Sequence, residues 1–264
     1  MNDAPVAVPV PAATILLLRG DHRTLEVFMV VRHEKIDFLA GALVFPGGKV
    51  DAPDADARLL AHCTGAAQSA DERALQVAAI RETFEECGVL LARPAGSASL
   101  IGGTALAALE PYRKALNGGA ITLLDFVVRE KLVLACDLLT PFAHWITPTM
   151  VPKRFDTHFF VAEAPPDQLA LHDGHESVES LWITPADAVD AARSRRYTVI
   201  FPTLRNLEKL ARAASPAEAR RQAEASTIVS VTPWSERRAD GNYLCIPKDA
   251  GYDVTEEKMP ERAR

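Results

Sequence analysis

One segment limits what this chain can fold into more than any other, the stretch VAAIRETFEECGV at residues 77–89. Its apolar residues recur at the spacing of one helix face, and Gly88 stands where a left-handed residue would end the helix. The acidic residues Glu82, Glu85 and Glu86 fall within a wedge of roughly 100° on the other face, because successive helical residues are about 100° apart. The sequence therefore predicts a helix with one core face and one face of concentrated negative charge.

The acidic face of this helix indicates a divalent cation. Glu82 and Glu86 are four residues apart, so their like charges raise the pKa of at least one of them unless a cation lies between them. Carboxylate oxygens without Cys or His ligands suit Mg²⁺, or Mn²⁺, better than Zn²⁺. Arg81 is four residues from Glu85 and could hold that carboxylate in place. The same E-x-x-E-E pattern is more often a solvated helix face, so the metal hypothesis needs a second feature.

A glycine loop upstream supplies the second feature. The run FPGGKV at residues 45–50 follows an apolar segment, which predicts a strand that ends in a loop. Gly47 and Gly48 let the backbone approach a ligand closely or offer a carbonyl oxygen to a metal. Together with RETFEECGV, this loop resembles the signature of the Nudix hydrolases, G-x5-E-x7-R-E-U-x-E-E-x-G-U, in which U is apolar. The matching residues are Arg81, Glu82, Glu85, Glu86, Gly88 and Val89.

The chain departs from this signature at three points. Gly48 and Arg81 are 81 − 48 = 33 positions apart, whereas the family spacing is about 14, so roughly 19 residues are inserted, as counted against the motif. Thr83 stands where an apolar residue is usual. The first acidic position stays unassigned, because Asp54 has the correct distance from Gly48 whereas Arg73 has the correct distance from Arg81. An insertion at this place is similar to the acyl-CoA diphosphatase branch of the family.

The resemblance implies an α+β fold, a Nudix-type mixed β-sheet sandwiched between helices, with helical insertions. We expect an extended arm at residues 1–13, a Nudix hydrolase domain at 14–213, and a C-terminal helix and tail at 214–264. The insertions are expected at about 51–73 and 100–135. Strands are predicted at 14–19, 26–32, 43–45, 143–147, 155–162 and 178–183, and helices at 105–116, 123–132, 204–213 and 216–225. A strand at 227–231 is expected to pair with 243–246, and the chain beyond 249 is expected to be frayed.

A second segment, WITPTMVPKRFDTHFFVA at residues 145–162, also resembles the acyl-CoA diphosphatase branch. Lys153 and Arg154 directly precede its second strand and could contact a phosphate, as Gly47 and Gly48 could. Nudix enzymes often place a further glutamate on a distant loop, and the resemblance nominates Glu176 or Glu163 as an extra ligand or general base. His172 and His175 lie in the same polar loop as Glu176, and we interpret them as surface histidines.

The resemblance implies the reaction. Glu82, Glu85, Glu86 and the Gly47 carbonyl would hold Mg²⁺, or Mn²⁺, and Arg81 and Glu176 would complete the catalytic group. The implied substrate is coenzyme A or acyl-CoA, cleaved to 3′,5′-ADP and 4′-phosphopantetheine or its acyl form. The alternatives are another nucleoside diphosphate derivative, such as ADP-ribose, NADH, a nucleoside diphosphate sugar or a dinucleoside polyphosphate, and a nucleotide-binding module without catalysis.

Composition and short sequence signals indicate which partners and which cellular compartment to expect for such an enzyme. A net charge of −6 argues against a general nucleic-acid binder. The sequence contains no apolar run long enough to span a membrane. Four cysteines without metal-type or paired spacing indicate a reducing compartment. The final residues, ERAR, are not a peroxisomal address, so we expect a cytoplasmic protein. The helical insertion is a candidate for a homodimer contact.

Overall fold

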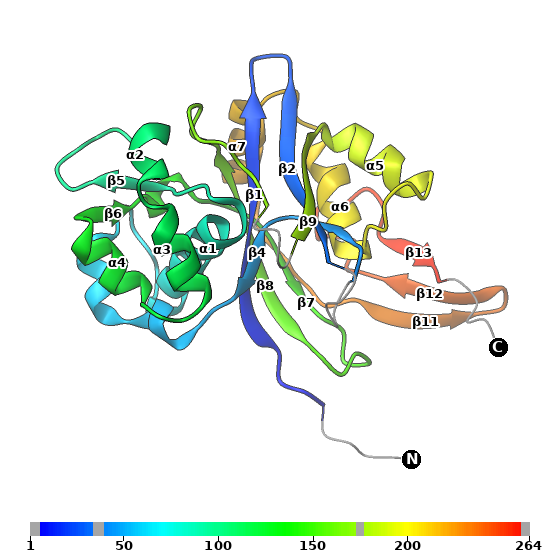
Figure 1. The fold of residues 1–264 in the computed structure, drawn as a ribbon. Coiled ribbons are helices and arrows are strands. Elements are labelled where there is room, and N and C mark those ends of the chain that lie inside the picture. The colour runs from blue at the N-terminus through cyan, green and yellow to red at the C-terminus, as the bar shows by residue number, and fades with distance from the viewer. Residues whose placement is uncertain (1–5, 34–39, 173–176, 260–264) are drawn as a thin grey trace.

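The core of the protein is one mixed β-sheet. The structure is a computed structural model that describes residues 6–33, 40–172 and 177–259. Within these ranges, eight strands form the sheet in the order β10-β7-β8-β1-β2-β3, with β4 beside β1 and β9 beside β2 (Figure 1). The strands are β1 (Val10–Gly20), β2 (Leu25–Arg32), β3 (Leu43–Val44), β4 (Gly47–Lys49), β7 (Thr140–Ile146), β8 (Phe155–Glu163), β9 (Ser177–Ile183) and β10 (Ser230–Val231).

Strand β1 organises this sheet. On one side it runs parallel to β8 from Val10 to Leu18. On the other side its first half pairs with β4 and its last residues pair with β2, both antiparallel. This double pairing places the glycine loop of β4 at the middle of the sheet. Strand β1 begins at Val10, four residues before the expected start at Thr14.

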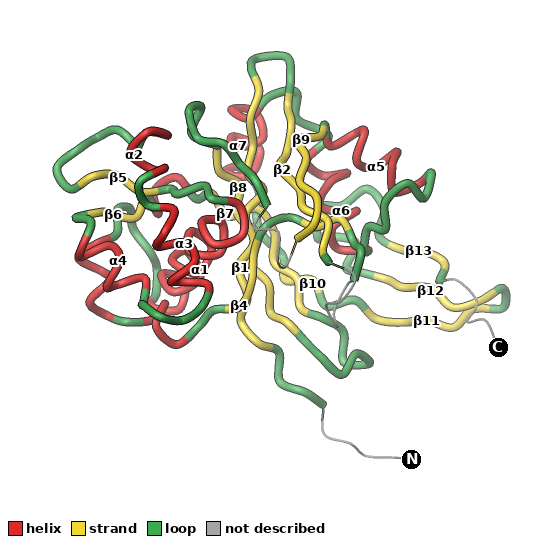
Figure 2. Tube along the Cα trace, in the orientation of Figure 1, coloured by secondary structure: helices red, strands yellow, loops and turns green. Residues whose placement is uncertain are grey.

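Helices cover both faces of the sheet, which confirms the predicted fold class (Figure 2). Alternate side chains of β1 pack into two hydrophobic cores, one on each face of the sheet. Ile15 and Leu17 pack with α1, whereas Leu16 and Leu18 pack with α5, α6 and α7. The first layer contains η1 (Ala52–Ala55), η2 (Ala57–His62), α1 (Ala70–Cys87), β5 (Ala92–Pro94), α2 (Gly103–Ala107), α3 (Glu110–Asn117), α4 (Leu123–Arg129), β6 (Leu132–Leu134) and η3 (Cys136–Leu138). The second layer contains α5 (Pro185–Arg193), α6 (Phe201–Leu210) and α7 (Pro216–Ala225).

The predicted helices are confirmed except in the insertion. Helix α1 begins at Ala70 after the N-cap Ser69 and ends at Gly88, whose φ of 70° is left-handed. The single helix expected at 105–116 is instead two, α2 and α3, because Pro111 has no N–H to continue an upstream helix and stands in the first turn of α3. The helix expected at 123–132 ends at Arg129.

The predicted pairing at the C-terminal end was wrong. Strand β10 pairs with β7, and β12 (Gly241–Cys245) pairs with β11 (Trp234–Arg238) and β13 (Glu256–Lys258). The segment after 249 is not frayed within the described range, since Tyr252 is buried against Trp145, whose indole N–H donates to the tyrosine oxygen at 2.8 Å. β7 and β10 are far apart in sequence, as are Trp145 and Tyr252, so strand patterns alone could not select these partners, whereas β11 and β12 are sequence neighbours that form a hairpin.

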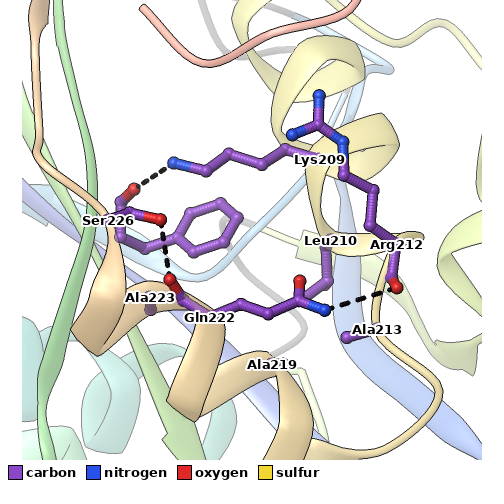
Figure 3. A pocket seen from close by; sticks show the side chains of 9 residues that line it. Lys209, Leu210, Arg212, Ala213, Ala219, Gln222, Ala223 and Ser226 are labelled. Atoms are coloured by element: carbon purple, nitrogen blue, oxygen red, sulfur yellow. Dashed lines mark hydrogen bonds between the residues drawn. The ribbon is translucent and has the colours of Figure 1, made fainter.

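A small pocket lies between α6 and α7, on the opposite face of the sheet from α1 (Figure 3). Lys209 donates to the Phe142 carbonyl at 2.8 Å, and Ser226 donates to the Gln222 carbonyl at 2.6 Å. Burial lowers the pKa of Lys209 to about 8. Because its polar groups bond to neighbouring residues and its walls are side chains of α6, α7 and β7 with the residues that follow the two helices, this pocket belongs to the packing of the second layer. Every helix in the described ranges is too short or too polar to cross a bilayer.

Candidate active site

The acidic face of α1 is buried. The apolar residues Val77, Ile80 and Phe84 pack into the core as predicted, but β4, η1 and α3 cover the other side of the helix. Glu85 and Glu86 are 7% and 5% exposed. The sequence pattern distinguished the two faces correctly, and β4, η1 and α3 shield the acidic face from bulk water.

Arg81 is the centre of a buried ionic network. Its Nε and Nη2 donate to the two carboxylate oxygens of Asp54, both at 2.9 Å. Its Nη1 donates to Glu82 at 2.9 Å and to Glu85 at 3.2 Å, and Nη2 also reaches the Lys49 carbonyl at 2.9 Å. These bonds raise the pKa of Arg81 further above its usual value, against the opposing effect of burial. One planar guanidinium thus fixes three carboxylates relative to the glycine loop.

Of the two residues that spacing offered for the first acidic position, Asp54 is the one that contacts Arg81. It is 2% exposed and lies in η1, in bidentate contact with Arg81. The other candidate, Arg73, instead donates to the backbone carbonyls of Thr64 and Gly65. The inserted residues therefore follow Asp54, between the glycine loop with its acidic partner and the helix.

The glycine loop contacts the carboxylates directly. The Gly47 N–H donates to Glu86 at 3.0 Å, which joins β4 to the last turns of α1. At Gly48 a Cβ would lie 2.4 Å from the carboxylate carbon of Glu82. Gly47 has a φ of 155°, and a Cβ there would lie 2.4 Å from the Ala13 carbonyl. No side chain larger than hydrogen fits at either position without movement, which explains the Gly-Gly pair.

Burial raises the pKa of the glutamates on this face. The pKa of Glu82 rises to about 7, first because of desolvation and then because of the neighbouring Glu85 charge, while Arg81 opposes the shift. Burial also raises the pKa of Glu85. The sequence predicted a raised pKa from repulsion between Glu82 and Glu86, and the direction is confirmed, but desolvation is the main cause. The site therefore holds more negative charge than its environment stabilises.

The chemistry of the donor set suits a hard divalent cation, and the oxygens of Glu82, Glu85 and Glu86 do not all lie within 4.8 Å of one another in this structure. Arg81 offers one positive charge to Asp54, Glu82 and Glu85 and lies 3.5 Å from the Asp51 carboxylate, and Glu86 adds a further carboxylate that accepts from the Gly47 N–H. All these donors are oxygens, which suit Mg²⁺ or Mn²⁺. Glu82, Glu85 and Glu86 would be the residues that hold the ion, whose charge would relieve the cost of their burial.

Of the predicted phosphate contacts, Gly47 and Gly48 lie against the carboxylates, whereas Lys153 and Arg154 directly precede β8. The guanidinium of Arg154 is buried, and it donates to the backbone carbonyls of Thr147 and Ala7 at 2.9 and 2.8 Å. These bonds fix the N-terminal segment against the loop before β8, which is a structural role. Lys153 is exposed, with its Nζ 5.8 Å from the Phe155 ring centroid. Neither residue shares a hydrogen bond with the carboxylate network among the contacts given above.

Of the two candidates for a further glutamate, the structure describes Glu163. Glu176 and His175 lie outside the described residues. Glu163 is the last residue of β8 and lies opposite Leu18 on β1. Leu18 is four residues along β1 from Thr14, which pairs with Gly47, so Glu163 lies about 13 Å from that pair along the strand direction. Strand alternation also directs Glu163 away from the α1 face, since its neighbour Ala162 packs in the α1 core. His172 bonds to Ser180 at 3.0 Å, in agreement with a surface histidine.

Sequence reasoning missed Arg113. This residue of α3 donates from Nε to the Glu85 carbonyl and from Nη2 to the Glu86 carbonyl, both at 2.8 Å. Its charge also lies at the negative end of the α1 dipole. The helical insertion thereby fixes the backbone of two carboxylate residues. No local pattern could have signalled a contact across 27 or 28 positions.

The raised pKa of Glu82 predicts a pH-dependent stability in the metal-free protein. A folded pKa near 7, against a usual value of 4.5, stabilises the fold below the unfolded pKa, and this contribution is lost as pH rises through about 7. Glu82→Gln is neutral throughout. In EDTA, we expect the melting temperature of the wild type to fall relative to Glu82→Gln between about pH 5 and pH 8. Thermal unfolding at a series of pH values in this range measures the difference in melting temperature, and Glu224→Gln on α7 is the control. Parallel curves for wild type and Glu82→Gln would contradict the expectation, and Mg²⁺ should narrow the difference.

Comparisons with known proteins agree with this arrangement. The sequence model of the NUDT19 Nudix domain matches residues 63–210. The Caenorhabditis elegans protein named nudix hydrolase 7 is 30% identical over 201 residues. The match covers 75% of this chain and 59% of that protein. The acyl-coenzyme A diphosphatase NUDT19 of Gallus gallus is 25% identical over 285 residues, covering 88% of this chain and 75% of that one.

The crystal structure of a NUDIX hydrolase from Alicyclobacillus acidocaldarius has a TM-score of 0.73 and 29% identity, and the match covers 82% of this chain and 97% of that one. The family match extends over more than half of the chain and includes α1, with Arg81, Glu82, Glu85 and Glu86. The chain therefore belongs to the Nudix hydrolases, in the branch represented by the NUDT19 Nudix domain.

Proposed function

We propose that the protein is a Mg²⁺- or Mn²⁺-dependent diphosphatase that cleaves coenzyme A or acyl-CoA to 3′,5′-ADP and 4′-phosphopantetheine or its acyl form. The observation that carries the reaction is the buried group of carboxylates on α1 against the Gly47-Gly48 loop. The excess negative charge of this group supports a cation site, and the residue pattern is that of the family.

The chain contributes positioning to this reaction. Glu82, Glu85 and Glu86, with the Gly47 carbonyl, would hold the cation, and Arg81 keeps two of these carboxylates in place through its bonds to Asp54. When bound, the cation would neutralise a diphosphate and lower the pKa of a water molecule. One glutamate would accept the proton of the attacking water, and the candidates are Glu82, Glu85 and Glu86, together with Glu176, which lies outside the described residues.

The choice of substrate rests on likeness to the NUDT19 relatives. The chain spans 75% of the length of the Gallus gallus diphosphatase and 59% of the length of the Caenorhabditis elegans protein. The leucines of the insertion, such as Leu106 and Leu116, are buried in the core around α1. They therefore give no independent argument for an acyl channel, and other nucleoside diphosphate derivatives are the runner-up substrates.

Product analysis tests the proposal. The purified protein is incubated with Mg²⁺ and, separately, CoA, an acyl-CoA, ADP-ribose, NADH and a diadenosine polyphosphate, and the products are identified by mass. We expect 3′,5′-ADP from CoA and its ester, and none in EDTA. Cleavage of another diphosphate with CoA intact would overturn the substrate and retain the chemistry. Calorimetric binding of a nucleotide without any product would overturn catalysis and favour a binding module.

A further inference from the structure

Three potential metal ligands meet on β7 and β8, outside the carboxylate network. His144 and His158 face each other across the antiparallel pair, with ring centroids 4.0 Å apart. Asp156 is two residues before His158 and therefore on the same face. The carboxylate is hydrogen-bonded to Nε2 of His144 and lies 3.8 Å from Nε2 of His158. In the described part of the chain, these residues form the one group of three or more such side chains with ligand atoms within 4.8 Å of one another.

A fourth residue orients this His144-Asp156-His158 cluster. Ser230 on β10 lies opposite His144 in a parallel pair, and its Oγ is 2.6 Å from Nδ1 of His144. Metal-binding histidines almost always use their second ring nitrogen in this way, which fixes the direction of the ligating nitrogen. Here the bond to Ser230 turns Nε2 toward Asp156 and His158.

The cluster lies on the same face of the sheet as α1 but apart from its carboxylates. Gly48 is opposite Ala13, Ala13 is opposite His158, and His158 is opposite His144. Since neighbouring strands are about 4.8 Å apart, His158 is about 10 Å and His144 about 14 Å from Gly48 along this row. His158 shares its face with Phe160, which packs in the α1 core. The two sites could therefore hold separate ions.

We propose that His144, Asp156 and His158 form a second metal site that binds Zn²⁺ and leaves a fourth position for water or a ligand. Two imidazoles and a carboxylate are a frequent Zn²⁺ set, in contrast to the oxygen donors on α1. Zn²⁺ bonds of roughly 2.0–2.2 Å place tetrahedral ligands about 3.4 Å apart. The 3.8 Å separation of His158 from Asp156 is close to this value, whereas the direct bond between His144 and Asp156 must open to admit the ion. All three side chains are partly exposed, so an ion can enter.

Metal titration of the full chain tests the proposal. The metal-free protein is titrated with Zn²⁺ in a calorimeter, in excess Mg²⁺ to occupy the α1 carboxylates, and with Co²⁺, whose visible absorption reports a tetrahedral site. We expect one Zn²⁺ per chain, lost in His158→Ala and in Asp156→Asn, and bound roughly 10- to 100-fold more weakly in Ser230→Ala. His22→Ala, in the exposed turn between β1 and β2, is the matched control and should bind as the wild type does.

Three results would overturn the proposal. The first is no Zn²⁺ binding in excess Mg²⁺, and the second is unchanged binding in both His158→Ala and Asp156→Asn. The third is loss of the Zn²⁺ in a Glu85→Gln, Glu86→Gln double variant, which would place the ion on α1. Circular dichroism checks the fold of each variant. If His158→Ala does not fold, His144→Gln replaces it, with the same expected loss.

Discussion

Glu85→Gln is expected to lower kcat for diphosphate hydrolysis by at least about a hundredfold, the scale on which a metal-activated or proton-accepting carboxylate contributes. Glutamine has the size of glutamate but no charge, so the cation would lose one of its charged ligands. The amide oxygen can still accept the 3.2 Å bond from Arg81, and burial of a neutral group costs less than burial of a charge. Activity should therefore fall while the melting temperature of the metal-free protein does not.

Steady-state kinetics with the cleaved substrate of the panel, at saturating Mg²⁺, measures this effect. Glu86→Gln should behave in the same way, because its amide oxygen can still accept from the Gly47 N–H. Glu224→Gln, an exposed glutamate on α7, is the matched control and should keep full activity. Full activity of Glu85→Gln, or of the wild type in EDTA, would refute the role given to the α1 carboxylates.

Arg81→Met should destabilise the fold by about 3–5 kcal/mol, the usual result of removing one partner from a buried ion pair. Methionine fills much of the same space but leaves Asp54, which is 2% exposed, without its bidentate partner. Glu82 and Glu85 lose a donor as well. For a chain of this size the melting temperature should fall on the order of 10 °C. Arg81→Lys should recover part of this loss, because lysine restores the charge but not the planar fork.

Urea and thermal unfolding of the metal-free protein measure the Arg81 effect. The control is Arg58→Met, since Arg58 also forms a close pair, with Asp56, but its side chain is 76% exposed. Exposed pairs contribute little, so this variant should change stability by no more than about 0.5 kcal/mol. Equal stability of Arg81→Met and wild type would show that the buried network does not stabilise the protein.

The sequence by itself determined the elements with local causes. Helix α1 follows from its apolar spacing, its Ser69 cap and its left-handed Gly88, all within one stretch. The same holds for α7, predicted at 216–225 and found at Pro216–Ala225. Hydrogen bonds between residues four apart form wherever the local pattern permits them, so local patterns suffice. The family signature then tied the α1 glutamates to the Gly47-Gly48 loop.

Only the tertiary structure decided what surrounds these elements. It selected Asp54 over Arg73 as the partner of Arg81, brought Arg113 to the end of α1, and buried Glu85 and Glu86 beneath β4, η1 and α3. It also joined His144 to Ser230 across 86 positions. Such contacts depend on how sheet register and core packing bring distant segments together, and no pattern within one segment encodes that choice.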